Sequence, residues 1–198
     1  MATEFEVLHW DQCHELCFRI YQKVVESGYT PDVIIGLARG GWIPARILSD
    51  FFSKDLSTLR VEFYHGIEER DGAPRLTQPL AAYKAWRQPL VVDDIVDTGK
   101  SLKLALEHLK SLGFEEIRSA CLHVKPQAET VPDFYMKETD AWVVYPWEVA
   151  EFTISLATLL RREKIPDDRI EERLLKFGLP ETYIRYFYKR WLRRQSEG

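Results

Sequence analysis

A chain of 198 residues, 45% of them hydrophobic, can bury one sizeable core and leave residues for an extension. The net charge of -4 argues against nucleic-acid binding over the whole surface, and no segment approaches the ~20 apolar residues of a membrane span. Three cysteines without a C-x-x-C pair indicate neither a disulfide framework nor a zinc ribbon. We therefore expect a soluble, unexported protein of the reducing cytoplasm.

Short apolar segments alternate with amphipathic ones along most of the chain, which predicts an α/β fold with a doubly wound, mostly parallel sheet. In chain order we expect a helix at 11–28, strand 32–37, turn 38–41, helix 42–52, strand 57–64, strand 89–94, helix 101–113, strand 117–124, strand 141–145, and C-terminal helices at 155–164, 166–178 and 180–194. The polar segment 65–79, with two prolines and two glycines, is too long for a simple turn and is predicted to form a lid loop.

Ligands of such sheets bind at the carboxyl ends of the strands. The residues at these ends are Ala38 to Gly41, Asp93 to Ser101, Lys125, and the Trp147-Glu148 pair. The loop DTGKS at 97–101 places glycine and hydroxyl residues at a helix N-terminus, where backbone N-H groups favour a phosphate. It is not a Walker A loop, because Asp94 stands near the place where that motif needs a glycine.

The paired acids Asp93 and Asp94 precede this anion cradle and must serve something other than the phosphate, because like charges repel. Carboxylates accept hydrogen bonds from vicinal sugar hydroxyls and help to hold Mg²⁺ through water. A phosphorylated sugar with free hydroxyls meets both demands. The alternative is that both acids only solubilise the end of a strand before a helix.

The stretch VVDDIVDTGKSL at 91–102 resembles the signature of the type I phosphoribosyltransferases, which bind 5-phosphoribosyl-1-pyrophosphate (PRPP). IIGLARGGWIPARILSD is similar to the first pyrophosphate loop of that family. HVKP and DAWVVYPWE are similar to the purine pocket of its short microbial and archaeal 6-oxopurine members. The resemblance covers about residues 8–152, and it implies the type I fold with a small hood at about 123–150.

The resemblance also implies a role for each matching residue. Asp93 and Asp94 would bind the ribose hydroxyls, Asp97 would be the general base near purine N7, and Glu148 would join the two acids as a metal contact. Pyrophosphate would be bound by Arg39, Gly40 and Gly41, on a loop that the family often holds with a non-proline cis peptide, and by Arg75 of the lid. The 5-phosphate would be bound by Asp97, Thr98, Gly99, Lys100 and Ser101, and the purine by Lys125, Trp142 and Val143.

The implied function is Mg²⁺-dependent transfer of phosphoribose from PRPP to guanine, xanthine or hypoxanthine, giving a nucleoside 5'-monophosphate and pyrophosphate in purine salvage. The family commonly forms dimers or tetramers, so a homo-oligomer is expected. The alternative is a non-catalytic regulator of the same fold that senses PRPP or nucleotide and binds nucleic acid. A PRPP sensor has no need of a base-reading pocket, which favours the enzyme.

The division of the chain expected from these patterns is a phosphoribosyltransferase domain at 1–152 and a helical extension at 153–198. The extension carries eleven Lys and Arg against seven Asp and Glu, so it is basic while the body is acidic. Docking within the chain or at a dimer contact is the ordinary explanation, and contact with RNA is less expected. His9, Cys13 and Cys17 have helical spacing that could clamp a metal, but a partly buried helix face explains the same spacing.

Overall fold

The computed structural model describes residues 4–64, 73–80 and 86–196. The chain forms two compact units, Asp11–Asp140 and Met1–Trp10 with Ala141–Gly198. We call the first the sheet unit and the second the helical unit. The predicted division after residue 152 falls inside a helix and does not coincide with the boundaries of these two units. That the functional domain ends at residue 152 stays a prediction. None of the described helices is long and apolar enough to cross a membrane.

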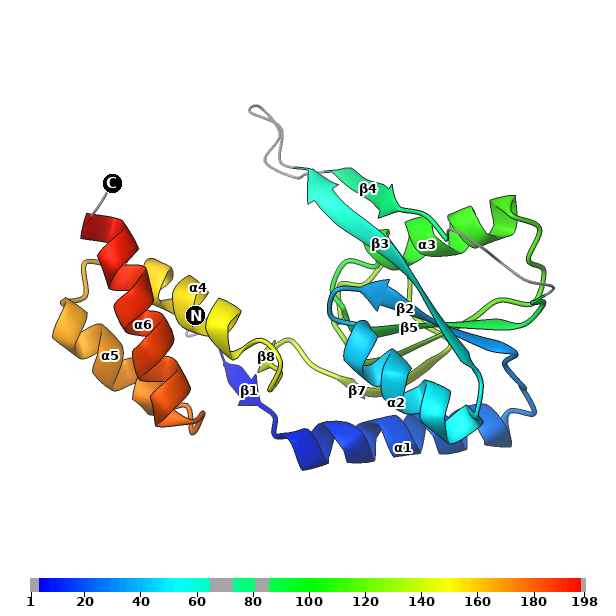
Figure 1. Cartoon of the computed structure of the whole chain (residues 1–198), viewed down its shortest axis with the longest axis horizontal. Helices are drawn as coiled ribbons and strands as arrows, with labels where there is room; N and C mark the ends of the chain where they lie inside the picture. Colours follow the sequence, from blue (N-terminus) through cyan, green and yellow to red (C-terminus); the bar gives the residue numbers. More distant parts are fainter. Residues whose placement is uncertain (1–3, 65–72, 81–85, 197–198) are drawn as a thin grey trace. The chain divides into compact units, whose positions relative to one another are not determined.

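The sheet unit is built on a six-stranded sheet in the order β4-β3-β2-β5-β6-β7 (Figure 1). All neighbouring pairs are parallel except β3 and β4, which confirms the mostly parallel α/β fold. The strands are β2 (Val33–Ala38), β3 (Asp55–Tyr64), β4 (Ala73–Gln78), β5 (Pro89–Val96), β6 (Arg118–Val124) and β7 (Phe134–Glu138), and the helices are α1 (Trp10–Glu26), α2 (Trp42–Phe52) and α3 (Lys100–Ser111).

Helices cover both faces of this sheet, with α1 and α2 on one side and α3 on the other (Figure 1). Every residue of β2 is buried, as expected for a central parallel strand packed on both faces. Alternate residues such as Val33 and Ile35 join Leu102 and Leu109 of α3 in one core cluster. On the opposite face, Gly36 lies against Ala45 of α2.

The prediction that 65–79 is a loop is wrong for 73–78, which form the edge strand β4. Residues 65–72 lie outside the described part of the chain. Pro74 is compatible with an edge strand, and Leu76 packs against the core while its neighbours are exposed. Arg75 is therefore exposed on an antiparallel strand, opposite Glu62 of β3.

The prediction that 141–145 extends the main sheet is also wrong, because β8 (Trp142–Val144) pairs in parallel with β1 (Phe5–Val7) in a separate two-stranded sheet. The strand beside β6 is instead β7, which the sequence did not predict. FYMKE lacks a continuous apolar run because it forms an edge, with two of its residues exposed.

The helical unit contains β1, β8 and three helices, α4 (Val149–Arg162), α5 (Asp167–Leu175) and α6 (Glu181–Ser196). The three helices confirm the predicted C-terminal ones, although α4 begins six residues earlier. They share a core that includes Phe152, Leu156, Ile170, Leu174, Tyr188 and Trp191. Trp191 is part of this packing, since only 5% of it is exposed.

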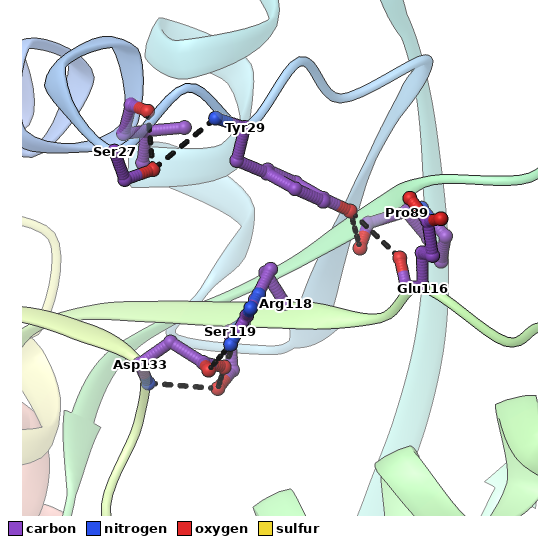
Figure 2. A network of polar contacts seen from close by, with 8 residues as sticks. Ser27, Tyr29, Pro89, Glu116, Arg118, Ser119 and Asp133 are labelled. Atoms are coloured by element: carbon purple, nitrogen blue, oxygen red, sulfur yellow. Dashed lines mark hydrogen bonds and ion pairs between the residues drawn. The ribbon is translucent and has the colours of Figure 1, made fainter.

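A polar network ties β6 to its neighbours near the start of the strand (Figure 2). The Asp133 carboxylate accepts hydrogen bonds from the backbone N-H and the hydroxyl of Ser119, both at 2.8 Å, and from Arg118 at 2.7 Å. Nearby, the Tyr29 hydroxyl lies 3.0 Å from the carbonyl oxygen of Pro89 and 2.9 Å from that of Glu116. Burial is the main cause that raises the pKa of Tyr29 above its ordinary value, so this hydroxyl stays a donor.

Asp133→Ala is expected to lower the free energy of unfolding by about 2 kcal/mol, because it removes a charged acceptor from the buried Ser119. Urea unfolding followed by circular dichroism measures the change. The control is Glu115→Ala, at an exposed carboxylate in the loop before β6. Equal stability of the two variants would contradict the proposed contribution of Asp133.

Candidate active site

The loops after β2 and β5 begin at the same edge of the sheet, because the two strands are parallel neighbours. The first contains Arg39, Gly40 and Gly41, and the peptide between Ala38 and Arg39 is cis, as the resemblance implies. The second contains Asp97 to Ser101 and leads into α3. The structure therefore brings the two predicted phosphate-binding loops to one edge.

Gly40 and Gly41 allow the first loop to lie directly on β5. A Cβ atom at Gly40 would collide with both carboxylate oxygens of Asp94. A Cβ atom at Gly41 would collide with the carbonyl oxygen of Val92 and come within 2.7 Å of that of Leu37. At Gly41 these are backbone atoms, so only glycine fits, whereas at Gly40 a side chain would have to displace the Asp94 carboxylate.

The paired acids differ in exposure. Asp94 is only 4% exposed, and its Oδ1 accepts a hydrogen bond of 2.8 Å from the N-H of Ile95. Asp93 is half-buried and accepts a hydrogen bond of 3.0 Å from the N-H of Asp94.

Burial, with the nearby charge of Asp94 as the second cause, raises the pKa of Cys13 on α1 to about 12. This thiol therefore stays protonated at neutral pH.

Cys13 and Cys17 are both fully buried on one face of α1, which confirms the predicted helix face for these two residues, whereas His9 precedes the helix and is exposed. In the part of the chain that the structure describes, no group of three or more His, Cys, Asp or Glu side chains could hold a metal ion. A metal at the paired acids would therefore need further oxygen ligands from a substrate or from water.

Gly99 is the N-cap of α3 and has a φ of 81°, a left-handed conformation that favours glycine. The first N-H groups of the helix have no partner within it, and Lys100 N lies 3.4 Å from the hydroxyl of Thr98. A hollow of about 130 Å³ faces this turn, lined by Phe63, Asp93, Ile95, Val96, Asp97, Thr98, Gly99, Ser101 and Leu102. The hollow joins the sugar-binding acid Asp93 of the prediction to the anion cradle.

Residues 125–130, which we call the strap, run beside this cradle. The parallel register pairs Val96 with Val124, so Asp97 and Lys125 begin adjacent segments. Lys125 N donates to Val96 O at 2.9 Å, and Glu129 N donates to Thr98 O at 3.0 Å. Thr130 covers Gly99, where a Cβ atom would come within 2.6 Å of its nitrogen. These contacts with the strap fix the position of the cradle backbone.

Two residues of the strap were missed by the sequence interpretation. Gln127 Nε2 donates to Asp97 Oδ1 at 2.6 Å, and Thr130 makes the contact with Gly99. Their partners lie about thirty residues earlier, so no local motif reveals them. The adjacency of β5 and β6 in the structure places the segments after these strands side by side, and the sequence alone does not give the register between them.

The remaining predicted residues lie in different places. Lys125 is half-buried in the sheet unit at the start of the strap. Trp142, Val143 and Glu148 belong to the helical unit. There Trp142 is 40% exposed and stacks on Phe5 with ring centroids 5.8 Å apart. A hollow of about 70 Å³ is lined by Trp142, Val144, Glu148, Glu151, Phe152 and Ser155.

An anion cradle and two acids at the carboxyl edge of a parallel sheet define an α/β protein built to bind a phosphorylated sugar or nucleotide. Residues 6–156 match the model of the phosphoribosyl transferase domain. The chain belongs to this family, and its fold is the type I phosphoribosyltransferase fold. Members of the family generally use Mg²⁺ with PRPP.

Two relatives share substantial sequence with the chain. A xanthine-guanine phosphoribosyltransferase of Gluconobacter oxydans is 30% identical over 152 residues, which cover 75% of this chain and 88% of the relative. The crystal structure of a purine phosphoribosyltransferase from Pyrococcus horikoshii is 40% identical, with a TM-score of 0.65, and the match covers 73% of this chain and 93% of that one.

A third protein supports the fold alone. The xanthine-guanine-hypoxanthine phosphoribosyltransferase of Helicobacter pylori is 20% identical, with a TM-score of 0.68, and the match covers 77% of this chain and 99% of that one. These three matches leave about a quarter of the present chain outside each alignment.

Proposed function

We propose that this protein transfers phosphoribose from PRPP to a 6-oxopurine base, releasing pyrophosphate and forming a nucleoside 5'-monophosphate. The observation that carries the proposal is the cradle at Gly99 next to Asp93, with the Gly40-Gly41 turn lying on Asp94. The names of the relatives support a purine as the acceptor.

PRPP offers a complementary group to each part of this edge of the sheet. Its 5-phosphate suits the N-H groups at the start of α3, where the helix dipole favours an anion. Its two ribose hydroxyls can donate hydrogen bonds to the carboxylates of Asp93 and Asp94. Its pyrophosphate suits the loop of Arg39, whose guanidinium is always charged.

Mg²⁺ suits the same acids, because carboxylates are hard oxygen ligands and the ion commonly keeps substrate phosphates and waters as its other ligands. Asp93 and Asp94 would hold the ion, directly or through water, and Glu148 is a further candidate. When bound, the ion would neutralise charge on the leaving pyrophosphate.

In the reaction, the bond between C1 of ribose and the pyrophosphate oxygen breaks as purine N9 forms its bond to C1. The electron pair leaves with pyrophosphate, where the Arg39 loop stabilises it. The proton on purine N7 passes to Asp97, which acts as general base. The resemblance assigns Lys125 to a hydrogen bond with purine O6, Trp142 to stacking on the base and Val143 to contact with its edge, and these assignments stay proposals. Arg75 remains a candidate contact to pyrophosphate from β4.

The three cysteines are buried free thiols, which suits a reducing compartment, and we place the enzyme in the cytoplasm as a dimer or tetramer. A spectrophotometric assay with PRPP, Mg²⁺ and guanine, xanthine or hypoxanthine tests the activity. We expect turnover of at least one base. Binding of PRPP without turnover of any purine would instead support the sensor.

Lys125→Ala is expected to raise the KM for the purine about tenfold or more while the Kd for PRPP changes little, because it removes a charged donor to O6. Steady-state kinetics and isothermal titration with PRPP measure the two effects. Lys110→Ala, at an exposed lysine in the last turn of α3, is the control. A larger loss for PRPP than for the purine would place Lys125 elsewhere in the site.

A further inference from the structure

The side chain of Gln127 is hydrogen-bonded to the proposed general base. Its Nε2 donates to Oδ1 of Asp97 at 2.6 Å. Gln127 is exposed, so its side chain contributes little to the stability of the fold. A short hydrogen bond from an exposed amide to a catalytic carboxylate fits a role in aiming that carboxylate.

We propose that Gln127 is a positioning residue that orients the Asp97 carboxylate for proton transfer, an inference that rests on the proposed function. The amide occupies one carboxylate oxygen and leaves Oδ2 as the acceptor of the proton from the purine. A neutral amide serves this purpose because it donates a hydrogen bond and takes no proton from the carboxylate.

The backbone of the strap holds Gln127 at a fixed place relative to Asp97. Two hydrogen bonds anchor the strap to the cradle on either side of Gln127, from Lys125 N to Val96 O at 2.9 Å and from Glu129 N to Thr98 O at 3.0 Å. A third bond, from Ala128 N to Lys125 O at 3.0 Å, closes a turn around Gln127. An amide on such a segment costs less entropy to orient than one on a free loop.

The strap also connects Gln127 to the residue that is proposed to bind the purine. Lys125, the proposed donor to O6, and Gln127 belong to the same hydrogen-bonded turn. A purine bound by Lys125 would therefore contact the segment that orients Asp97. The strap would align the acceptor of the N7 proton with the base that carries it.

Gln127→Ala in the full-length protein is expected to lower kcat about 10- to 100-fold, because misplacement of a catalytic group is costly even when binding survives. The Kd for PRPP with Mg²⁺ should stay within about twofold and the melting temperature should not change, because Gln127 is exposed. Glu129→Ala is the matched control, because the contact made by Glu129 in the strap comes from its backbone N-H.

Two further variants separate positioning from a general structural effect. Gln127→Glu places a second carboxylate beside Asp97, and repulsion should move the acid limb of the kcat-pH profile to higher pH. In an Asp97→Asn background, Gln127→Ala should cause no further loss, because the group that it orients is already inactive as a base.

Unchanged kcat and pH profile in the Gln127 variants would overturn the positioning role while leaving the proposed function intact. An undiminished loss in the Asp97→Asn background would also overturn it, since Gln127 would then act on something else. Absence of turnover in the unaltered protein would reject the proposed function, and the positioning role with it.

Discussion

Gly99→Ala is expected to weaken PRPP binding more than about 100-fold, the loss that follows when one or two charge-assisted hydrogen bonds to the 5-phosphate are removed. Two observations support this result. Gly99 has φ of 81°, where a side chain is strained, and a Cβ atom would come within 2.6 Å of Thr130 N and 2.7 Å of Thr130 O. These are backbone atoms of the strap, so no side-chain rotation relieves the contact. The N-H groups at the start of α3 must move, and titration calorimetry with PRPP and Mg²⁺ measures the loss.

The same helix provides a matched control at its other end. Gly113 has φ of 91°, but no atom lies within 4 Å of the place where its Cβ would stand. Gly113→Ala should therefore cost about 1 to 2 kcal/mol of stability through strain alone and leave PRPP affinity unchanged. Equal loss of affinity in both variants would show that strain in α3, and not displacement of the cradle by the strap, decides binding.

The central strands were predictable because burial on both faces makes their sequences continuous apolar runs. VIIGLA in β2 is buried throughout, and β5 is nearly so. The edge strands β4 and β7 were missed because each exposes part of its length, which interrupts the apolar pattern. The sequence of 141–145 predicts a strand but not its sheet, because its partner residues in β1 lie 137 positions earlier.

The residues of the site differ in the same way, because some belong to a contiguous sequence motif and others depend on contacts between distant segments. The acids and the anion cradle were predictable because they are contiguous in VVDDIVDTGKSL, and a strand, a turn and a helix start have local signatures. The need for Gly40 was visible only as a motif; the structure supplies its cause, the Asp94 carboxylate that its hydrogen faces. The strap could not be predicted, because its contacts require the register between β5 and β6.

Asp97→Asn is expected to lower kcat about 10²- to 10⁴-fold, the usual contribution of a general base, while PRPP binding is largely kept. Asparagine has nearly the shape of aspartate, so Gln127 retains an oxygen acceptor and the cradle retains its backbone N-H groups. What it loses is the ability to take the proton from purine N7. Single-turnover kinetics with saturating base and PRPP measure the chemical step, and titration with PRPP measures binding.

The comparison that isolates this role is Asp93→Asn, at a half-buried acid of the same hollow that is assigned to the sugar and the metal. Removing its charge should weaken PRPP with Mg²⁺, because a neutral amide is a poorer ligand for the ion. Asp97→Asn should instead lower turnover and retain the affinity for PRPP. The loss of turnover should become smaller as the pH rises, because free hydroxide then replaces the missing base. Equal loss of turnover and PRPP affinity in Asp97→Asn would contradict the general-base role and assign Asp97 to substrate binding.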